Sequence, residues 1–325
     1  MSKTRPGASS NRHPVPSINA GADRRELAAM TVVVICLAVA LVVIGLAWAA
    51  GRQHGRRGMA AGQSAITADD VLIMQARQLH AAEISSRLPA LTALEQHAQA
   101  TPWHRAAVVE TLTGYLRCAP SGDETVRRAV QRTLSAHASP AHGDAYWGEL
   151  DLDLDGAELT DLDLSGAVVR RISARRAQLR GDTRMTALRA RDSVLLSGAT
   201  LYGDMHCDDM IVEHRTDMAL TTFKGAFSAD GCALHGGTVL SGATFCGPAS
   251  FADTIFFDSV ALSDPRSGPA AFRGKTSFAR ARFTAARLDH VGFPAGVDLE
   301  DTRFIRTPAT PTTAVAVLHA LGRQR

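Results

Sequence analysis

The chain has 325 residues, of which 46% are hydrophobic and 21% are charged, a composition typical of a folded protein. Its net charge of +3 is too small to indicate nucleic acid or another polyanion as a partner. The five cysteines are odd in number and lack paired spacing, which argues against a disulfide framework. We therefore expect them to be reduced residues of a hydrophobic core.

The N-terminal part contains one long apolar segment. Residues 1–26 are rich in Ser, Pro, Asn and Arg without apolar periodicity, and are predicted to be disordered. Residues 27–51 carry no charge, and about 20 helical residues span the ~30 Å hydrocarbon core of a bilayer. A buried soluble helix or a cleaved signal peptide, which Ala47-Trp48-Ala49 would suit, is the alternative. The length of the run and of the segment before it favours a retained transmembrane helix.

This helix predicts a single-pass protein of the cell membrane, bound to the membrane through residues 27–51. Arginines flank the segment on both sides, with Arg24 and Arg25 before it and Arg52 and Arg56 after it, so the positive-inside rule does not decide the orientation. The unpaired cysteines favour a cytoplasmic location for the rest of the chain.

After a Gly/Ala-rich linker at 52–66, residues 67–140 have the signals of short amphipathic helices. Thr67 with Asp70, Thr101 followed by Pro102, and Ser121 with Glu124 are typical of helix starts, and Pro89 could open a further helix. Because each helix is short and apolar on one side, the helices must pack on each other or on the following domain. This helical region is interpreted as a structural cap, with partner binding as the alternative.

From residue 145 to 305, apolar residues recur every five positions, which neither a helix nor a single strand produces. Each is preceded two positions earlier by a second apolar or small residue. Such a repeat predicts a mainly β solenoid of seven or eight stacked coils, each of about 20 residues, with both residues of each pair pointing inward. The clearest members are the series Leu154, Leu159, Leu164, Val169, Ala174 and Leu179 and the series Leu240, Phe245, Phe251 and Phe256.

The pattern is incomplete in places. No consistent inward residues can be assigned in 180–193 and 202–222, and six-residue spacings such as Leu234 to Leu240 indicate bulges or larger corners. Residues 264–269 are predicted to form a loop. The tail at 306–325 is expected to include a short helix, at 314–321, that covers the open end of the solenoid.

These units resemble the pentapeptide-repeat family, in which a small residue, Asp or Asn, and Leu or Phe are followed by variable residues. The best matches are 155–159 (DGAEL), 241–245 (SGATF) and 279–283 (ARARF). Residues 108–137 and the following YWGELDLDLDGAEL segment are similar to a membrane-anchored subgroup from high-GC bacteria. The resemblance implies a right-handed quadrilateral β-helix with no catalytic residues and, for most members, no assigned activity. No cofactor or metal is expected. Some family members mimic DNA and protect a topoisomerase.

Two polar clusters have residue types that could form a site. His206, Cys207, Asp208 and Asp209, with His214 nearby, could ligate a metal, but no second Cys/His pair follows at zinc-site spacing, so a polar loop is the interpretation. An acid ladder precedes a run of arginines, and we interpret both as solvated surface, with docking of a partner or self-association as the alternative. The acid ladder comprises Asp151, Asp153, Asp155, Glu158, Asp161 and Asp163, and the arginine run comprises Arg170, Arg171, Arg175, Arg176, Arg180, Arg184, Arg189 and Arg191.

No phosphate-binding loop, dinucleotide fingerprint or hydrolase motif occurs in the sequence. The sequence therefore predicts a non-enzymatic, membrane-anchored scaffold or protein-interaction surface with an unidentified protein partner. The alternative function is a DNA mimic that acts on a topoisomerase. The arginine run interrupts the line of carboxylates that such a mimic needs, and nucleic acid itself is not an expected partner.

Overall fold

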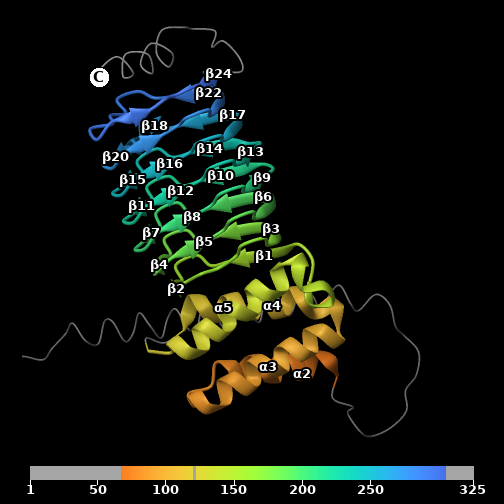
Figure 1. Cartoon of the computed structure of the whole chain (residues 1–325). Helices are drawn as coiled ribbons and strands as arrows, with labels where there is room; N and C mark the ends of the chain where they lie inside the picture. Colours follow the sequence, from red (N-terminus) through yellow and green to blue (C-terminus); the bar gives the residue numbers. More distant parts are fainter. Residues whose placement is uncertain (1–66, 120–121, 305–325) are drawn as a thin grey trace, which may run out of the picture. The chain divides into compact units, whose positions relative to one another are not determined.

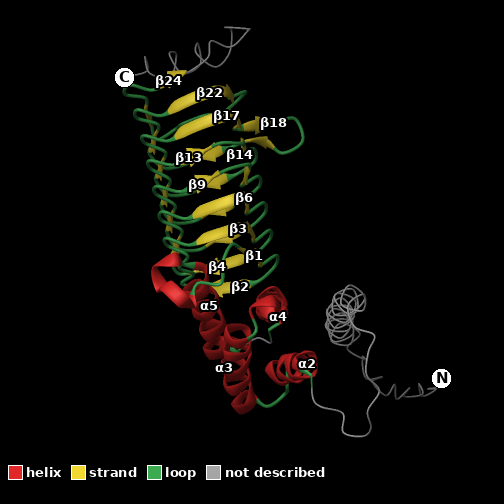
Figure 2. Ribbon diagram, turned by 90° about the vertical axis from the view of Figure 1, so that its right-hand side faces the viewer, coloured by secondary structure: helices red, strands yellow, loops and turns green. Residues whose placement is uncertain are grey.

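The computed structural model describes residues 67–119 and 122–304, which form a helical region followed by a β-solenoid (Figures 1 and 2). This confirms the predicted mainly β solenoid and the α-helical region before it. No helix within the described ranges has the length and apolar character needed to cross a membrane. The transmembrane helix predicted at 27–51 lies outside these residues, as do the segments 1–26, 52–66 and 306–325.

The helical region contains four α-helices and two short 3-10 helices. Thr67 begins the first α-helix with the predicted capping box, in which the Thr67 and Asp70 side chains each accept from the backbone amide of the other residue. Leu79, Leu94 and Leu112 from three different helices are fully buried and form the core of the region. The elements are α2 (Ala68–Leu79), α3 (Ile84–Ala100), η1 (Pro102–His104), α4 (Arg105–Cys118), α5 (Glu124–Ala138) and η2 (Pro140–Ala145).

Two predicted helix starts differ from the structure. Pro89 lies inside α3, which begins earlier at Ile84. An interior proline costs about 3 kcal/mol, and burial of Leu91 and Leu94 on the same helix offsets this cost. The N-cap of α5 is Asp123 rather than Ser121, and its carboxylate accepts hydrogen bonds from Arg87 and Tyr115 rather than capping the helix.

The solenoid runs from β1 to β24 and has about seven turns. Apart from the antiparallel pair β18–β19, its strands pair in parallel with the equivalent strand of the next coil. Its strands are β1 (Leu150–Asp153), β2 (Glu158–Thr160), β3 (Val168–Ser173), β4 (Gln178–Arg180), β5 (Thr183–Arg184), β6 (Arg189–Leu195), β7 (Thr200–Leu201), β8 (Met205–His206), β9 (Ile211–Val212), β10 (Arg215–Asp217), β11 (Thr222–Phe223), β12 (Phe227–Ser228), β13 (Ala233–Leu234), β14 (Gly237–Val239), β15 (Thr244–Phe245), β16 (Ala249–Ser250), β17 (Ile255–Ala261), β18 (Ser263–Asp264), β19 (Gly268–Pro269), β20 (Ala271–Phe272), β21 (Thr276–Ser277), β22 (Arg282–Arg287), β23 (Val297–Asp298) and β24 (Arg303–Phe304).

Three parallel sheets run along the solenoid. The first contains β1, β3, β6, β10, β14 and β17 on one side of each coil, and β9, β13, β22 and β24 pair with it on another. The second contains β2, β4, β7, β11, β15 and β20, and the third contains β5, β8, β12, β16, β21 and β23. In Figure 1 the second sheet lies along the left edge of the coils.

The coils are longer than the predicted 20 residues. Thr200 pairs with Thr222, and Thr222 pairs with Thr244, so that these coils contain 22 residues. The buried series Leu201, Cys207, Val212, Met218 and Phe223 shows that the spacing alternates between six and five. Only the earliest coils keep the strict five-residue spacing, as in the pairing of Leu159 with Leu179.

Each 22-residue coil contains two six-residue spacings, and a column of glycines explains one of them, the spacing from Leu201 to Cys207 and its equivalents in later coils. Gly203, Gly225, Gly247 and Gly274 stack at one corner, where each backbone closely approaches the coil before it. A Cβ on Gly225 would lie 2.5 Å from the carbonyl oxygen of Gly203, and one on Gly247 would lie 2.5 Å from that of Gly225. Because real Cβ atoms do not approach backbone this closely, this corner requires glycine.

The residues that sequence reasoning left unassigned also point inward. Thr183, Met185 and Leu188 fill the first unassigned stretch, and Met205, Cys207, Met210, Val212, Thr216, Met218 and Thr221 fill the second, all of them buried. Methionine, cysteine and threonine thus occupy positions where other coils place leucine, phenylalanine or alanine. Further along, the rings of Phe223, Phe245 and Phe272 stack with centroids 4.7 Å apart, which matches the strand spacing.

The predicted loop at 264–269 is a hairpin inserted into one coil. It includes the antiparallel pair β18 and β19, and it lengthens the separation of Phe245 from its partner Phe272 to 27 residues. The coil resumes without a shift of the buried face, since Leu262 and Ala270 on either side of the hairpin are both buried and hydrogen bonded to each other. The hairpin is therefore an addition outside the packed tube.

Candidate interaction surfaces

The tube inside the coils is filled by side chains. Leu159, Phe223 and Phe256 are at most 1% exposed, and their neighbours along each ladder are similarly enclosed. Close packing of this kind leaves no internal room for a substrate. The polar groups that can contact another molecule therefore lie on the outside of the coils and on the helical region.

The residues considered for metal binding do not converge. Cys207 is fully buried in the tube, where burial raises the pKa of its thiol, and the adjacent His206 belongs to the outward face of β8. The Asp208 carboxylate accepts hydrogen bonds from the Ser228 hydroxyl and the Asp230 amide of the next coil. Within the described ranges, no three His, Cys, Asp or Glu side chains are grouped in a way that could hold a metal ion.

Asp208 illustrates a role that recurs along the solenoid. Asp155 accepts from the Ser173 hydroxyl and the Arg175 amide, and Asp230 accepts from the Ser250 hydroxyl and the Ala252 amide, in each case from the next coil. These carboxylates join successive coils at a corner where a backbone amide would otherwise lack a partner. Part of the acidic surface is therefore structural.

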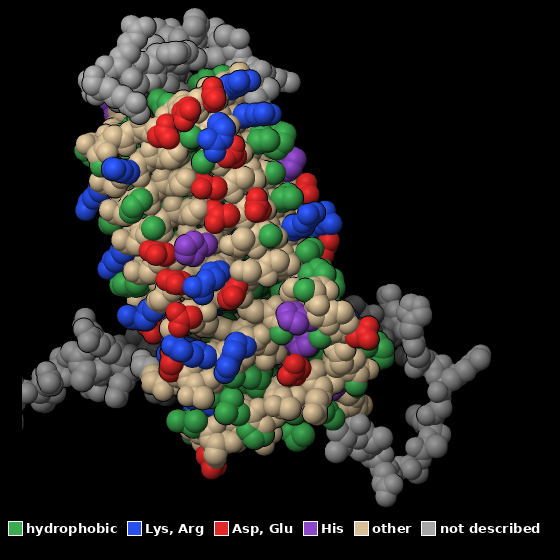
Figure 3. Space-filling model, in the orientation of Figure 1, with side chains coloured by type: hydrophobic (Ala, Val, Ile, Leu, Met, Phe, Trp, Pro, Cys, Tyr) green, Lys and Arg blue, Asp and Glu red, His purple; other side chains and the backbone are tan. Residues whose placement is uncertain are grey.

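The acid ladder is largely neutralised within the molecule. Arginines of α4 and α5 contact one set of its carboxylates, in the pairs Arg117–Asp153, Arg127–Glu158 and Arg128–Asp161. The next coil supplies Arg170 to Asp151 and Arg175 to Asp155. Figure 3 shows the resulting mixture of positive and negative side chains on one face of the protein. Three of the six ladder carboxylates thus form a contact surface for the helices of this chain.

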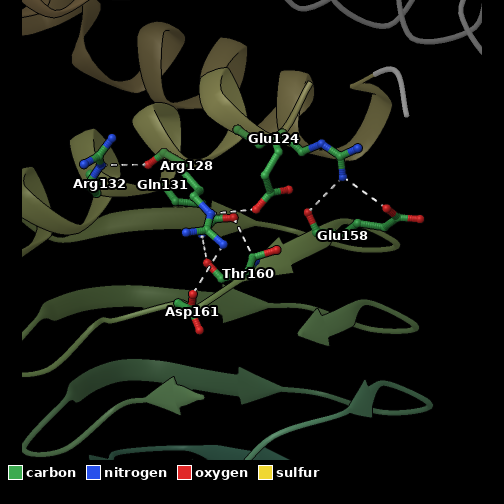
Figure 4. A network of polar contacts seen from close by, with 8 residues as sticks. Glu124, Arg128, Gln131, Arg132, Glu158, Thr160 and Asp161 are labelled. Atoms are coloured by element: carbon green, nitrogen blue, oxygen red, sulfur yellow. Dashed lines mark hydrogen bonds and ion pairs between the residues drawn. The ribbon is translucent and has the colours of Figure 1, made fainter. Parts of the chain in front are cut away.

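A groove lies between α5 and the first coil, and Figure 4 shows its polar contacts. Arg128 donates to Glu124 at 2.7 Å and lies 3.5 Å from Asp161, while Gln131 donates to the Thr160 carbonyl at 2.8 Å. The Gln131 side-chain oxygen also accepts from the Thr160 backbone amide. The side chain of Gln131 therefore satisfies both backbone groups of Thr160, at the edge strand β2 of the solenoid. The open cavity beside this network has a volume of about 640 Å³ and is lined by Arg132, Ser135, Ser139, His142, Asp163 and Ser165.

A second junction contact is formed by Trp147. Its ring stacks on that of His137 with centroids 3.8 Å apart, and its indole nitrogen donates to Gln99 at 3.0 Å. His137 in turn contacts Glu95 at 2.8 Å. These residues bring α3, α5 and the start of the solenoid together, so the groove and the acid-ladder contacts belong to one packed unit.

The helical region also holds a buried polar cluster that the sequence reasoning missed. Asp123 accepts from both Arg87 and the Tyr115 hydroxyl, and the exposed fractions of the three residues are between 1% and 6%. Burial, reinforced by the bond to Asp123, raises the pKa of Tyr115. Because the three residues come from separate segments, no local sequence motif predicts the cluster. The cluster is enclosed by the helices and fits a structural role.

One sheet face has a different composition from the rest. We call it the cation face. It consists of the outward residues of β4, β7, β11, β15 and β20, together with the one residue that directly follows each of the last four strands. The parallel register places them in two columns, Gln178, Thr200, Thr222, Thr244 and Ala271, and beside it Arg180, Tyr202, Lys224, Cys246 and Arg273. Neither column contains a carboxylate.

The cations of this face have no acidic partner among the residues that the structure describes. No carboxylate of the described residues lies within ion-pair distance of Arg180, Lys224 or Arg273. On the neighbouring sheet, Arg170, Arg191 and Arg215 are paired, whereas Arg189, Arg282 and Arg287 make no ion pair with a described carboxylate either. Arg180 and Lys224 instead lie on the Tyr202 ring, 5.2 Å and 4.1 Å from its centroid. Sequence reasoning counted Arg180 in a general basic run, because the strand register that separates it from its neighbours is not visible along the chain.

No family model, curated protein or solved structure matches this chain.

Proposed function

We propose that this protein is a non-enzymatic, membrane-anchored pentapeptide-repeat protein whose right-handed quadrilateral β-helix is a rigid docking scaffold. The observation that carries the proposal is the filled interior, in which the inward residues of successive coils pack on one another without a substrate cavity. Function must then reside on the outer surface, and a stacked parallel solenoid holds its surface residues at fixed spacing.

The family assignment is supported by the repeat units themselves. In 155–159, 241–245 and 279–283, the last residue of the unit and the residue two before it are both buried. Each unit also holds a tight turn with a positive φ, at Gly156, Gly242 and Arg280. The alternation of five- and six-residue spacings then follows from added corner residues, such as the stacked glycines, without a change in the inward pair.

The membrane anchor rests on the uncharged segment 27–51, and the proposed cytoplasmic location rests on the unpaired cysteines. Alkaline extraction of membranes that contain the full chain is expected to leave the protein in the membrane pellet. A reporter active on only one side of the membrane, fused to the C-terminus, tests the orientation. Release by alkali would contradict the anchor, and activity on the outer side would contradict the cytoplasmic location.

The scaffold function is tested by affinity capture after cross-linking in intact membranes, with the full chain as bait. A protein partner should be recovered, and it should be lost when charges are reversed on one face of the coils but not on another. If no surface substitution affected recovery, the partner would not be bound by the coils. A change in supercoiling by a topoisomerase at stoichiometric ratios would instead support the DNA-mimic alternative.

A further inference from the structure

The cation face has the features of a binding surface for an extended acidic peptide. Its three cations lie in one column, on every second strand, at Arg180, Lys224 and Arg273. Strands in a sheet are about 4.8 Å apart, so that successive cations are ~9.6 Å apart along the solenoid axis. All three residues are exposed.

The carboxylates around this column are engaged elsewhere. Glu158 and Asp161, which lie on and just after the neighbouring strand β2, contact Arg127 and Arg128 of α5. Asp182 and Asp204 lie at the adjoining corner, where Asp182 contacts Arg184 at 2.9 Å and Asp204 accepts from the Ala226 amide at 2.8 Å. From β11 onward the corner positions are Ala226, Pro248 and Lys275, and none is acidic. The three cations of the face are therefore not neutralised by an ion pair with any carboxylate of the described residues.

The column beside the cations, which contains Thr200, Thr222 and Thr244, supplies hydrogen-bonding groups. Thr200, Thr222 and Thr244 stack in register, and their hydroxyls make no hydrogen bond within the described residues. Tyr202, which is 39% exposed, lies between the cations. Tyrosine and arginine are enriched in protein interfaces, and three free hydroxyls in a line can bond to the backbone of an extended chain.

We propose that the cation face binds an extended acidic polypeptide segment along the solenoid axis, with Asp or Glu at every third residue. In the polyproline II conformation a chain rises ~3.1 Å per residue and returns to the same side every third residue, a repeat of ~9.3 Å that matches the cation spacing. Nucleic acid carries a charge every ~3.4 Å along each strand and fits this sparse column poorly. This inference rests on the proposed scaffold function and names the class of its partner.

The test uses the full chain in detergent and a fluorescein-labelled peptide, EPPEPPEPPE, in which proline enforces the extended conformation. The expected result is saturable binding that weakens as salt is raised, because salt screens exposed charges. The peptides EEEEPPPPPP and QPPQPPQPPQ control for spacing and charge. The first should bind at least about fivefold more weakly, and the second should not bind measurably.

Charge reversal locates the site. Arg180→Glu with Lys224→Glu is expected to lower affinity at least tenfold. Arg266→Glu is the matched control, because Arg266 is an exposed cation in the β18–β19 hairpin without an ion pair among the described residues, and it should leave affinity unchanged. Tyr202→Phe should bind like the unsubstituted chain, whereas Tyr202→Ala should bind severalfold more weakly. Far-UV circular dichroism establishes that all variants are folded.

Equal binding of the spaced and clustered peptides would overturn the proposal, as would unchanged affinity in the double variant. Tighter binding of a single-stranded oligonucleotide or of anionic lipid vesicles than of the peptide would also overturn it. A further outcome is that membrane capture recovers a partner whose binding depends on another face of the coils, while the peptide fails to bind. In that case the scaffold function stands and only the assignment of the cation face fails. If capture also recovers nothing, both proposals fail.

Discussion

The helical region and the coils are stabilised in different ways. In the helical region each important contact occurs once, as in the buried cluster of Arg87, Tyr115 and Asp123. In the coils the same contact recurs with every turn, as in the stacked rings of Phe223, Phe245 and Phe272. A repeated contact can be recognised from a single sequence, because its period is visible, whereas a contact that occurs once between distant residues leaves no such pattern.

This difference predicts that a charge introduced inside the tube of the coils reduces the stability of the fold more than any other substitution proposed below. Phe245 stacks between Phe223 and Phe272, and Phe245→Asp would place an unpaired carboxylate among buried rings. Loss of a buried phenylalanine alone costs about 3–5 kcal/mol, and the buried charge adds to this. We expect thermal unfolding, measured by circular dichroism, to lose its cooperativity. Phe257→Asp, at a ring that is 44% exposed, is the control and should change stability little.

In the helical region, removal of one partner of the buried cluster should have the next largest effect. Arg87→Met leaves the Asp123 carboxylate buried without its cation, and breaking such a pair costs about 3–5 kcal/mol. Denaturant unfolding measures the change. Arg128→Met removes the ion pairs with Glu124 and Asp161, which are about half exposed, and exposed pairs of this kind contribute at most about 1 kcal/mol each. Similar losses in the two variants would show that the cluster does not stabilise the helices.

The glycine column offers a smaller perturbation of the coils. In Gly225→Ala, the new Cβ would lie 2.4 Å from an Asp204 carboxylate oxygen and 2.5 Å from the Gly203 carbonyl oxygen. Overpacking of this kind costs typically about 1–3 kcal/mol. Gly237→Ala is the matched control, because its Cβ would meet nothing closer than 4.0 Å. A lower melting temperature for Gly225→Ala alone is expected, and equal melting temperatures would contradict the close approach.

The smallest predicted effect is a pH dependence of the helical region. Partial burial, reinforced by the neighbouring His104, lowers the pKa of His97 below its ordinary value of 6.5. The unfolded chain therefore binds a proton at His97 more readily than the folded chain. The free energy of unfolding is consequently not reduced by His97 above pH 6.5, and it decreases as the pH falls below this value. Comparison of melting temperatures at pH 7.5 and 5.5 measures the effect. His97→Gln should make the melting temperature less dependent on pH over this range, and an unchanged dependence would contradict the assignment.

Within the coils, predictability followed the identity of the inward residue. Leucine and phenylalanine made the period visible from Leu154 to Leu179 and from Leu240 to Phe256. The stretches with Thr183, Met185, Met205 and Cys207 were left unassigned, although the structure places these side chains in the same tube. The tube requires a side chain of suitable volume rather than one residue type, and threonine and cysteine are also common on surfaces, so their inward position could not be read from the chain.

The candidate surfaces were less predictable than the fold. Grouping of charges along the sequence suggested an acid ladder and an arginine run as separate features. Stacking of the coils instead brings Arg170 to Asp151 and Arg175 to Asp155. The helices supply Arg117, Arg127 and Arg128 to Asp153, Glu158 and Asp161. The cation face arises because Arg180, Lys224 and Arg273, which are far apart in sequence, fall on one column.

The sequence alone determined that the chain forms a stacked β-solenoid after a set of short helices, because hydrophobic burial at a fixed period requires that geometry. Only the tertiary structure decided the coil length of 22, since a corner residue such as Gly225 adds length without changing the inward pair. It also decided which charges remain unpaired, because electrostatic neutralisation depends on distances between coils and not on spacing along the chain.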